Sequence, residues 1–194
     1  MTATPRITYY VAASLDGFIA ARDGGLDWLT PFDSTGEDYG YQALLAETDA
    51  IIMGRSTYRH CLAMGGGRWP YPDTPSHILT SWLPREETPP PAVHFTDSDP
   101  PALVNALAQQ GRQRIWLVGG GETAGHFLRA DLIDCLILSI IPVVLGDGVP
   151  LFGTAGDRPG KLPTTGRSLK LEATQTYPSG LVQLRYARGT SIKD

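Results

Sequence analysis

The sequence has few cysteines and no long apolar run. Its two cysteines, Cys61 and Cys135, lie far apart and form no Cys-x-x-Cys motif, so we expect two reduced thiols. The first residues lack the apolar core of a signal peptide, and no segment approaches the length of a membrane span. These absences predict a cytoplasmic protein without a membrane partner.

Patterns typical of metal sites and nucleophilic catalysis are also missing. The four histidines lack metal-ligand spacing, so no metal site is expected, and no Gly-x-Ser-x-Gly motif occurs. The segment from Gly156 to Lys161 resembles a phosphate loop, but it is one residue short and Leu162 replaces the required Ser or Thr. The net charge of −4 argues against nucleic acid as the main partner. A phosphate would therefore have to be held by a local pocket.

Length and hydrophobic pattern predict a single α/β domain over residues 1–194. Hydrophobic residues make up 42% of the chain, which is enough for a core. Strand-like segments alternate with helix-like ones, which favours a mostly parallel central sheet flanked by helices. A C-terminal antiparallel hairpin is expected from the extended runs 168–177 and 181–188, which flank Pro178-Ser179-Gly180. The other expected strands are residues 7–13, 18–20, 49–53, 77–80, 93–95, 115–118 and 135–144, and helices are expected over residues 37–48, from 55 on, from the N-cap Asp99 to Gly111, and from 122 on.

The stretch from Ile115 to Leu128 organises the rest of the chain. It predicts a buried strand, a turn of three glycines without side chains, and a helix. A helix that begins at bare glycines presents free backbone N–H groups and the positive end of its dipole, which favours a phosphate. A tight turn without a ligand is the alternative.

The same glycines match the dinucleotide fingerprint as Gly119-x-Gly121-x-x-Ala124. The doubly wound fold that usually carries this fingerprint has an acidic residue about 20 positions further on, at the end of the next strand. Here the next strand runs into Pro142 without an acid at its end. If these glycines bind a dinucleotide, they therefore do so in a fold other than the usual doubly wound one.

Two other segments also follow short strands, namely Gly54-Arg55-Ser56-Thr57 and Thr80-Ser81. Because the carboxyl ends of parallel strands share one edge of a sheet, we expect both segments to meet Gly119–Thr123 there. Together they offer two helix N-termini, an arginine, hydroxyl groups and bare glycines. This set suits a ligand with two or more phosphates, although Arg55 taken alone is better explained as a solvated helix residue.

Five segments, in their order and spacing, resemble one known family: Ala12–Ala20, Asp27–Leu29, Ile52–Tyr58, Val118–Glu122 and Leu138–Gly153. Over about residues 6–188 the chain resembles the dihydrofolate reductase-like fold family. Within that family it is most similar to the C-terminal reductase domain of the riboflavin biosynthesis enzyme RibD, as a stand-alone member.

The resemblance implies an NADPH-dependent reductase that transfers a hydride to a C=N or C=O bond of a small heterocyclic substrate. It places Ala13 and Ile19 beside the nicotinamide, with Trp28 as a further cofactor contact. The remaining implied cofactor contacts are Gly54, Arg55, Ser56 and Thr57 at a phosphate, Ser81 with Arg85 near the adenosine 2′-phosphate, Thr80 beside them, and Gly119, Gly120, Gly121, Glu122 and Thr123 against the pyrophosphate.

A reductase of this kind also needs a proton donor, and the candidate catalytic residues are Asp27 and Asp33. In dihydrofolate reductases an acid on the first helix, shortly after a tryptophan, serves the pterin; if Trp28 corresponds to that tryptophan, Asp33 falls near the place of the acid. Asp33 as a capping residue is an equally good interpretation. Asp16 lies near the same predicted pocket, where it would simply fix its turn.

Departures from the family pattern leave the substrate open. Riboflavin-pathway reductases carry an acid just before the glycine run that holds the substrate sugar, and here Val118 occupies that position. The zinc motif of the deaminase partner domain is absent, and residues 22–36 lack the proline-rich substrate loop of dihydrofolate reductases. A true dihydrofolate reductase, a riboflavin-pathway pyrimidine reductase and a non-catalytic nucleotide-binding protein are therefore the alternatives.

Members of this family often pair, so the resemblance also implies a homodimer. The long apolar strand over residues 135–144 is one candidate for the contact between copies. It is equally well explained as a central strand of one sheet.

Overall fold

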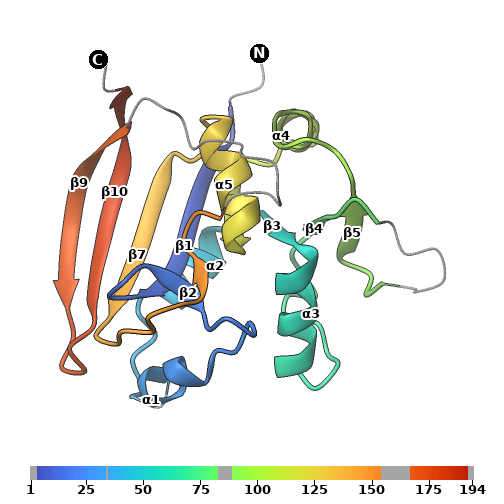
Figure 1. Ribbon diagram of the computed structural model, residues 1–194. Helices are drawn as coiled ribbons and strands as arrows, with labels where there is room; N and C mark the ends of the chain where they lie inside the picture. Colours follow the sequence, from blue (N-terminus) through green and yellow to red (C-terminus); the bar gives the residue numbers. More distant parts are fainter. Residues whose placement is uncertain (1–3, 34, 83–88, 154–166, 192–194) are drawn as a thin grey trace.

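The computed structural model describes residues 4–33, 35–82, 89–153 and 167–191, and an eight-stranded sheet forms its centre (Figure 1). The strand order is β5-β4-β3-β6-β1-β7-β10-β9. All pairs from β5 to β7 are parallel, whereas β10 is antiparallel to both β7 and β9. The strands are β1 (Arg6–Ser14), β3 (Ala50–Gly54), β4 (Ser76–Leu79), β5 (Val93–Thr96), β6 (Arg114–Gly119), β7 (Cys135–Ile141), β9 (Arg167–Thr176) and β10 (Val182–Ser191).

Helices and a small second sheet complete the structure and confirm the predicted α/β architecture. The second sheet pairs β2 (Phe18–Ala20) with β8 (Val149–Pro150). None of the helices in the described ranges is long and apolar enough to cross a bilayer. The helices are a 3-10 turn (Asp27–Leu29), α1 (Thr30–Asp33), α2 (Tyr41–Glu47), α3 (Arg55–Met64), α4 (Pro100–Gln109) and α5 (Gly121–Arg129).

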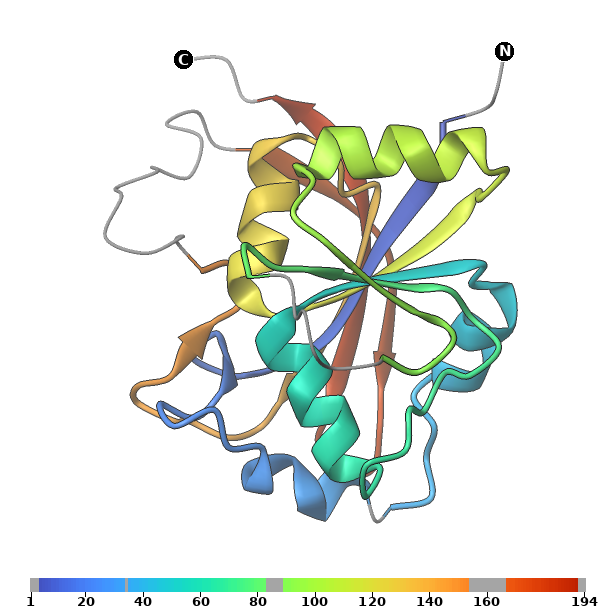
Figure 2. The same ribbon diagram turned by 90° about the vertical axis from the view of Figure 1, so that its right-hand side faces the viewer.

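Each face of the sheet carries its own apolar core. Leu107 of α4 and Phe127 of α5 are fully buried on one face, whereas Tyr58 of α3 and Trp116 of β6 are buried on the other. Figure 2 shows α5 and α2 on opposite sides of the sheet. The central strands are apolar toward both faces, which explains why they appear in the sequence as unbroken apolar runs rather than as an alternating pattern.

Two predicted boundaries were wrong for local reasons. The helix expected from residue 37 begins at Tyr41, because Tyr39 and Gly40 have φ angles of 53° and 82°, which a right-handed helix does not allow. The strand expected over residues 135–144 ends at Ile141, directly before Pro142, which has no N–H group to donate. This strand, β7, is paired with β1 and β10 on its two sides, so it is a central strand without a free edge. The homodimer stays a prediction.

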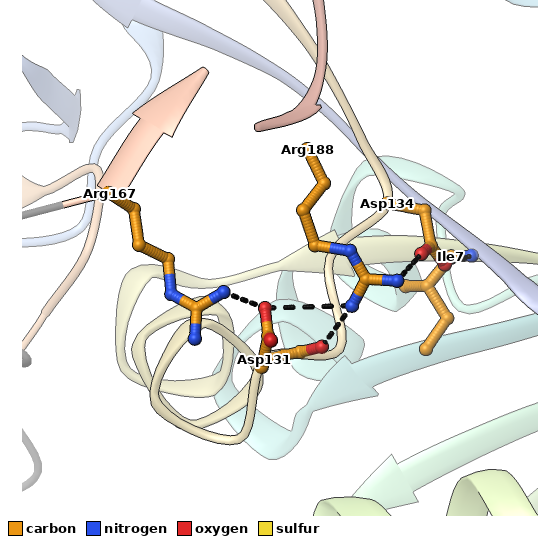
Figure 3. A network of polar contacts seen from close by, with 5 residues as sticks. All are labelled: Ile7, Asp131, Asp134, Arg167 and Arg188. Carbon is orange, nitrogen blue, oxygen red and sulfur yellow. Dashed lines mark hydrogen bonds and ion pairs between the residues drawn. The ribbon is translucent and has the colours of Figure 1, made fainter. Parts of the chain in front are cut away.

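A polar network fastens the hairpin to the body of the sheet at the amino end of β7 (Figure 3). Arg188 on β10 forms an ion pair with Asp134 at 2.7 Å and donates a hydrogen bond to the backbone oxygen of Asp131 at 2.6 Å. The carboxylate of Asp131 also pairs with Arg167 on β9, and that of Asp134 accepts a hydrogen bond from the backbone N–H of Ile7 on β1 at 2.9 Å. Three strands are thereby tied together at the edge of the sheet opposite the carboxyl ends of its parallel strands.

Candidate functional site

The carboxyl ends of β3, β4 and β6 bring the three predicted strand-end segments together. In the sheet register, Gly54 lies beside Leu79, the last residue of β4, and Met53 lies beside Gly119, the last residue of β6. A Cβ atom added to Gly54 would lie 2.6 Å from the hydroxyl oxygen of Thr123. Segments distant in the sequence therefore form one site.

Two of the helices at this edge begin without a side-chain cap. The N-caps of α3 and α5 are Gly54 and Gly120, and neither helix has a side-chain hydrogen bond to its first turn. By contrast, the carboxylate of Asp99 accepts a hydrogen bond from the N–H of Ala102 at the start of α4, at 2.8 Å. Helices α3 and α5 thus present first-turn N–H groups and the positive ends of their dipoles, which together suit an anion.

The three consecutive glycines have three different surroundings. Gly119 has a φ angle of 118° and is joined to Gly120 by a cis peptide bond, and a Cβ atom on it would lie 3.6 Å from Cε2 of the buried Tyr9. A Cβ atom on Gly120 would lie 3.4 Å from the hydroxyl oxygen of Thr57 and 3.8 Å from Cδ1 of Ile19. A Cβ atom on Gly121 would overlap the carbonyl oxygen of Pro150. Gly120 is therefore the glycine that borders the predicted cofactor residues, whereas Gly121 allows close packing of the chain.

Arg55 adds positive charge at the start of α3, next to a residue that the sequence reasoning missed. Its guanidinium carbon lies 3.9 Å from the centre of the Trp82 ring, which is 51% exposed. The hydroxyl of Thr80 accepts a hydrogen bond from the N–H of Trp82 at 3.1 Å and donates one to its carbonyl at 3.0 Å. Ser56 and Ser81 are exposed at the same edge. A tryptophan directly after the predicted Thr80-Ser81 segment was the available signal for this contact.

The residues predicted beside the nicotinamide lie at the end of β1 and just beyond it. Ala13 is buried in β1, and the next residue, Ser14, accepts a hydrogen bond through its hydroxyl from the N–H of Phe18 in β2 at 3.0 Å. This bond holds β2, and with it Ile19, close to the end of β1. Trp28 is half-buried in the 3-10 turn, and its indole N–H has no partner among the described residues.

The structure gives a clear role to one of the three acidic residues considered for this site, Asp16. Asp27 is exposed at the first position of the 3-10 turn, and Asp33 ends α1 with its side chain outside the described part. Asp16 fixes a loop: its carboxylate accepts hydrogen bonds from the N–H groups of Leu145 and Gly146 at 3.1 and 2.7 Å, and from the hydroxyl of Ser14 at 2.6 Å. These bonds, above all the one from Ser14, lower the pKa of Asp16 below its usual value.

Other sequence predictions fall on residues that lie outside the described part. These are Arg85, predicted near the adenosine 2′-phosphate, and the loop from residue 156 to 161. Within the described part, no group of three or more His, Cys, Asp and Glu side chains is placed to hold a metal ion.

Comparison with known proteins shows which family this chain is similar to. The family model of the RibD C-terminal domain matches residues 5–183. The uncharacterized protein YwjB of Bacillus subtilis (strain 168) is 36% identical over 179 residues, which cover 92% of this chain and 95% of YwjB. The likeness to both therefore extends over nearly the whole chain.

Solved structures agree with that result. A candidate riboflavin biosynthesis protein of Shewanella sp. PV-4 aligns with a TM-score of 0.82 and 30% identity, over 95% of this chain and 99% of that one. A dihydrofolate reductase of Enterococcus faecalis, solved with NADP(H) and RAB-propyl, aligns with a TM-score of 0.62 and 17% identity, over 96% and 98% of the two chains. The second likeness concerns the fold alone, and it confirms the predicted dihydrofolate reductase-like architecture.

Proposed function

The chain belongs to the RibD C-terminal domain family, and we propose that it is an NADPH-dependent reductase of a small heterocyclic substrate. The observation that carries the proposal is the pair of uncapped helix N-termini at Gly54 and Gly120, on one edge of the sheet. The dihydrofolate reductase that shares this fold was solved with NADP(H), which supports the choice of cofactor.

The residues at this edge fit a dinucleotide. The first turns of α3 and α5 offer backbone N–H groups, and Arg55, Ser56 and Thr57 add a positive charge and two hydroxyl groups beside the first of them. Glu122 in the first turn of α5 is exposed, so its charge is screened by solvent. We assign the cofactor phosphates to these two helix starts.

The nicotinamide end is assigned to the apolar side of the same site. Ile19 lies next to Gly120, and Ala13 is buried at the end of β1. When bound, NADPH supplies the hydride for a C=N or C=O bond. The protein then contributes position: Ser14 holds β2 against β1, and Asp16 holds the loop at Leu145 and Gly146.

Proton delivery is assigned to Asp27 or Asp33 as candidates. Both lie in the short helical segment after β2, at its two ends. The variants Asp27→Asn and Asp33→Asn remove a proton-donating group and keep the size of the side chain. Because a proton donor acts only while it is protonated, the variant of the true donor should lose the alkaline-side limb of the pH–rate profile while it retains NADPH affinity.

Turnover tests the proposal. Purified protein is mixed with NADPH and candidate heterocycles, and loss of the near-ultraviolet absorbance of the reduced nicotinamide is followed. We expect substrate-dependent oxidation of NADPH. Turnover of dihydrofolate would identify a dihydrofolate reductase, and turnover of a riboflavin-pathway pyrimidine would identify a pyrimidine reductase. Binding of NADPH without turnover of any heterocycle or carbonyl compound would favour the non-catalytic nucleotide-binding alternative.

A further inference from the structure

A cavity of about 300 Å³ lies between α2 and the sheet, and none of its wall residues is among the predicted cofactor contacts. Its walls include Arg6 on β1, Arg114 on β6 and Arg185 on β10. We call it the arginine cavity after these three residues. Ala43 and Leu44 of α2 form its cover. Side chains from distant parts of the sequence thus bring three positive charges to one cavity.

The three arginines extend from the same face of the sheet. Arg6 and Arg114 are partners in the parallel register of β1 and β6, so their side chains leave the sheet next to each other. Tyr10 and Arg185 are both register partners of Ile137 on β7. Since side chains alternate along a strand, Arg6 shares a face with Tyr10, and Arg185 lies on that face as well.

The buried thiol of Cys135 on β7 senses two of these charges. Burial raises the pKa of Cys135, whereas the positive charges of Arg185 and Arg6 oppose that rise. Strand β7 lies between β1 and β10 in the sheet. The guanidinium groups on its two neighbours therefore converge over it.

Acidic residues close to the arginine cavity have other partners. The carboxylate of Asp49 accepts the backbone N–H of Arg114, at 3.1 Å to each oxygen. Asp134, at the amino end of β7, pairs with Arg188 at 2.7 Å (Figure 3). Within the described part of the chain, neither Arg6 nor Arg114 forms an ion pair. Both side chains are exposed, so a ligand can reach them.

The arginine cavity is therefore locally positive in a chain whose net charge is −4. Glu47 is the single acid in its described lining, and it is exposed. Arg185 pairs with Glu172 at 3.4 Å, but both side chains are about 40% exposed, and such surface pairs contribute little. Two unpaired guanidinium groups and one weakly paired group thus face one carboxylate.

Hydrogen bonds close the arginine cavity toward the carboxyl end of β1. The backbone oxygen of Tyr39 accepts a hydrogen bond from the hydroxyl of Tyr10 at 3.2 Å and another from the side-chain amide of Gln183 at 2.9 Å. Arg114 is the first residue of β6 and Gly119 is the last, so at about 3.3 Å per residue they lie about 17 Å apart. The cavity is therefore separate from the helix starts that are assigned to the cofactor.

Size and charge define the ligand class. Pockets for small molecules usually measure about 300–1,000 Å³, so this one suits a compact ligand. A guanidinium group binds a phosphate or a carboxylate through two parallel hydrogen bonds. Arg6 and Arg114, side by side, match a ligand with two negative charges, and Thr8 adds a hydroxyl group to the same wall.

We propose that the arginine cavity is a second anion site, which binds a compact dianion independently of the cofactor. Arg6 and Arg114 hold the ligand, and α2 covers it. A phosphate group and a pair of carboxylates share this chemistry, and the experiment distinguishes them. The inference goes beyond the proposed reductase function and does not depend on it.

Calorimetric titration of the full chain tests the proposal. The probes are inorganic phosphate, malonate as a dicarboxylate, and acetate as a single carboxylate. They are compared at one ionic strength, because salt screens charge attraction, and at a mildly alkaline pH that keeps phosphate doubly charged. NADP⁺ is added first so that the cofactor site is occupied. We expect phosphate or malonate to bind at least about tenfold more tightly than acetate, and the tighter of the two identifies the ligand's anionic group.

Four variants locate the binding. Arg6→Gln and Arg114→Gln should each weaken it about tenfold. Ala43→Leu keeps every charge, fills the cavity and should abolish binding, and leucine is a good helix former, so α2 is retained. Arg59→Gln removes an exposed arginine from α3 and should leave binding unchanged. Thermal unfolding midpoints of the same samples show that each variant is folded.

Several results would overturn the assignment. An equal loss of affinity in Arg59→Gln would reduce the effect to general charge attraction. Unchanged binding in the folded variants Ala43→Leu and Arg6→Gln would place the ligand elsewhere. Binding that NADP⁺ displaces and Arg55→Ala abolishes would assign the anion to the cofactor edge. Saturable NADPH binding without binding of any probe at millimolar concentration would remove the second anion site alone, whereas absence of NADPH binding would remove only the proposed function.

Discussion

Gly54 and Thr123 lie so close that a Cβ atom on Gly54 would be 2.6 Å from the Thr123 hydroxyl oxygen. Gly54 caps α3, and Thr123 lies in the first turn of α5, so this contact sets how near the two helix starts approach each other. Since both starts are assigned to one cofactor, their separation should control its affinity.

Gly54→Ala should therefore weaken NADPH binding about tenfold or more and lower the free energy of unfolding by about 1–3 kcal/mol, because the new methyl group pushes the helices apart. The double variant Gly54→Ala/Thr123→Ala removes the opposing hydroxyl and should recover most of the stability. Chemical denaturation and NADPH titration of both variants measure the two effects. Equal stability loss in the single and double variants would show that the contact is not the cause.

Gly120 and Gly121 should respond differently to the same change. Gly120→Ala introduces ordinary contacts with Thr57 and Ile19, so the protein should fold normally and lose NADPH affinity by about tenfold. Gly121→Ala pushes a methyl group into the carbonyl of Pro150 and should lower stability by about 1–3 kcal/mol or more. Thermal unfolding and NADPH titration separate the two variants. A folded Gly120→Ala protein with unchanged affinity would move the cofactor away from this glycine.

Arg55→Ala should reduce NADPH affinity by about ten- to a hundredfold, which corresponds to the loss of a charge-assisted contact of about 1.5–3 kcal/mol. The effect should shrink at high salt because charge attraction is screened. Arg59→Ala, an exposed arginine one turn further along α3, is the matched control and should have little effect. Similar losses in both variants would indicate general charge attraction rather than a specific contact.

His77 should make stability depend on pH. Its ring stacks on His94 of the neighbouring strand at 5.2 Å between centres, and its Nε2 has no partner among the described residues. Burial, then His94 and Arg112, lowers the pKa of His77 from 6.5 to about 4. The unfolded chain therefore binds more protons between these values, so stability is complete above pH 6.5 and falls as the pH drops toward 4.

The variant His77→Phe should remove much of this dependence. Thermal unfolding midpoints at neutral and mildly acidic pH, compared with those of the wild-type protein and of His60→Gln as a control, measure it. An identical acid-induced drop in His77→Phe and in the wild-type protein would assign the effect to other groups.

Asp134→Ala should affect stability without affecting cofactor affinity. The carboxylate of Asp134 pairs with Arg188 and accepts the N–H of Ile7, at the edge of the sheet opposite the candidate site. Loss of these contacts should cost about 1–3 kcal/mol of unfolding free energy. Chemical denaturation gives the stability, and an NADPH titration below the transition gives the affinity. A weakened NADPH affinity in the folded variant would contradict the separation of the two edges.

The fold was predictable because its signals are local. Unbroken apolar runs such as Ile115–Val118 mark strands buried on both faces, and Asp99 followed by Pro100 marks the start of a helix. The rule that carboxyl ends of parallel strands share an edge then brings Gly54 and Gly119 together without further information.

The parts that escaped prediction depend on contacts between distant residues or on unusual backbone angles. The positive φ of Tyr39 delays the start of α2, and its carbonyl meets Gln183, 144 positions away. Asp16 caps the N–H groups of Leu145 and Gly146 across a similar distance in sequence. No local pattern indicates such partners, so the contact between Tyr39 and Gln183 was not predicted, and a turn-fixing role was one interpretation of Asp16 among others.

Titration of the purified protein with NADPH and NADH, followed by quenching of tryptophan fluorescence, tests the central claim most directly. The account predicts saturable binding of NADPH, tighter than that of NADH and weakened in the folded variants Arg55→Ala and Gly120→Ala. Absence of binding of either nucleotide at millimolar concentration by the folded wild-type protein would contradict it.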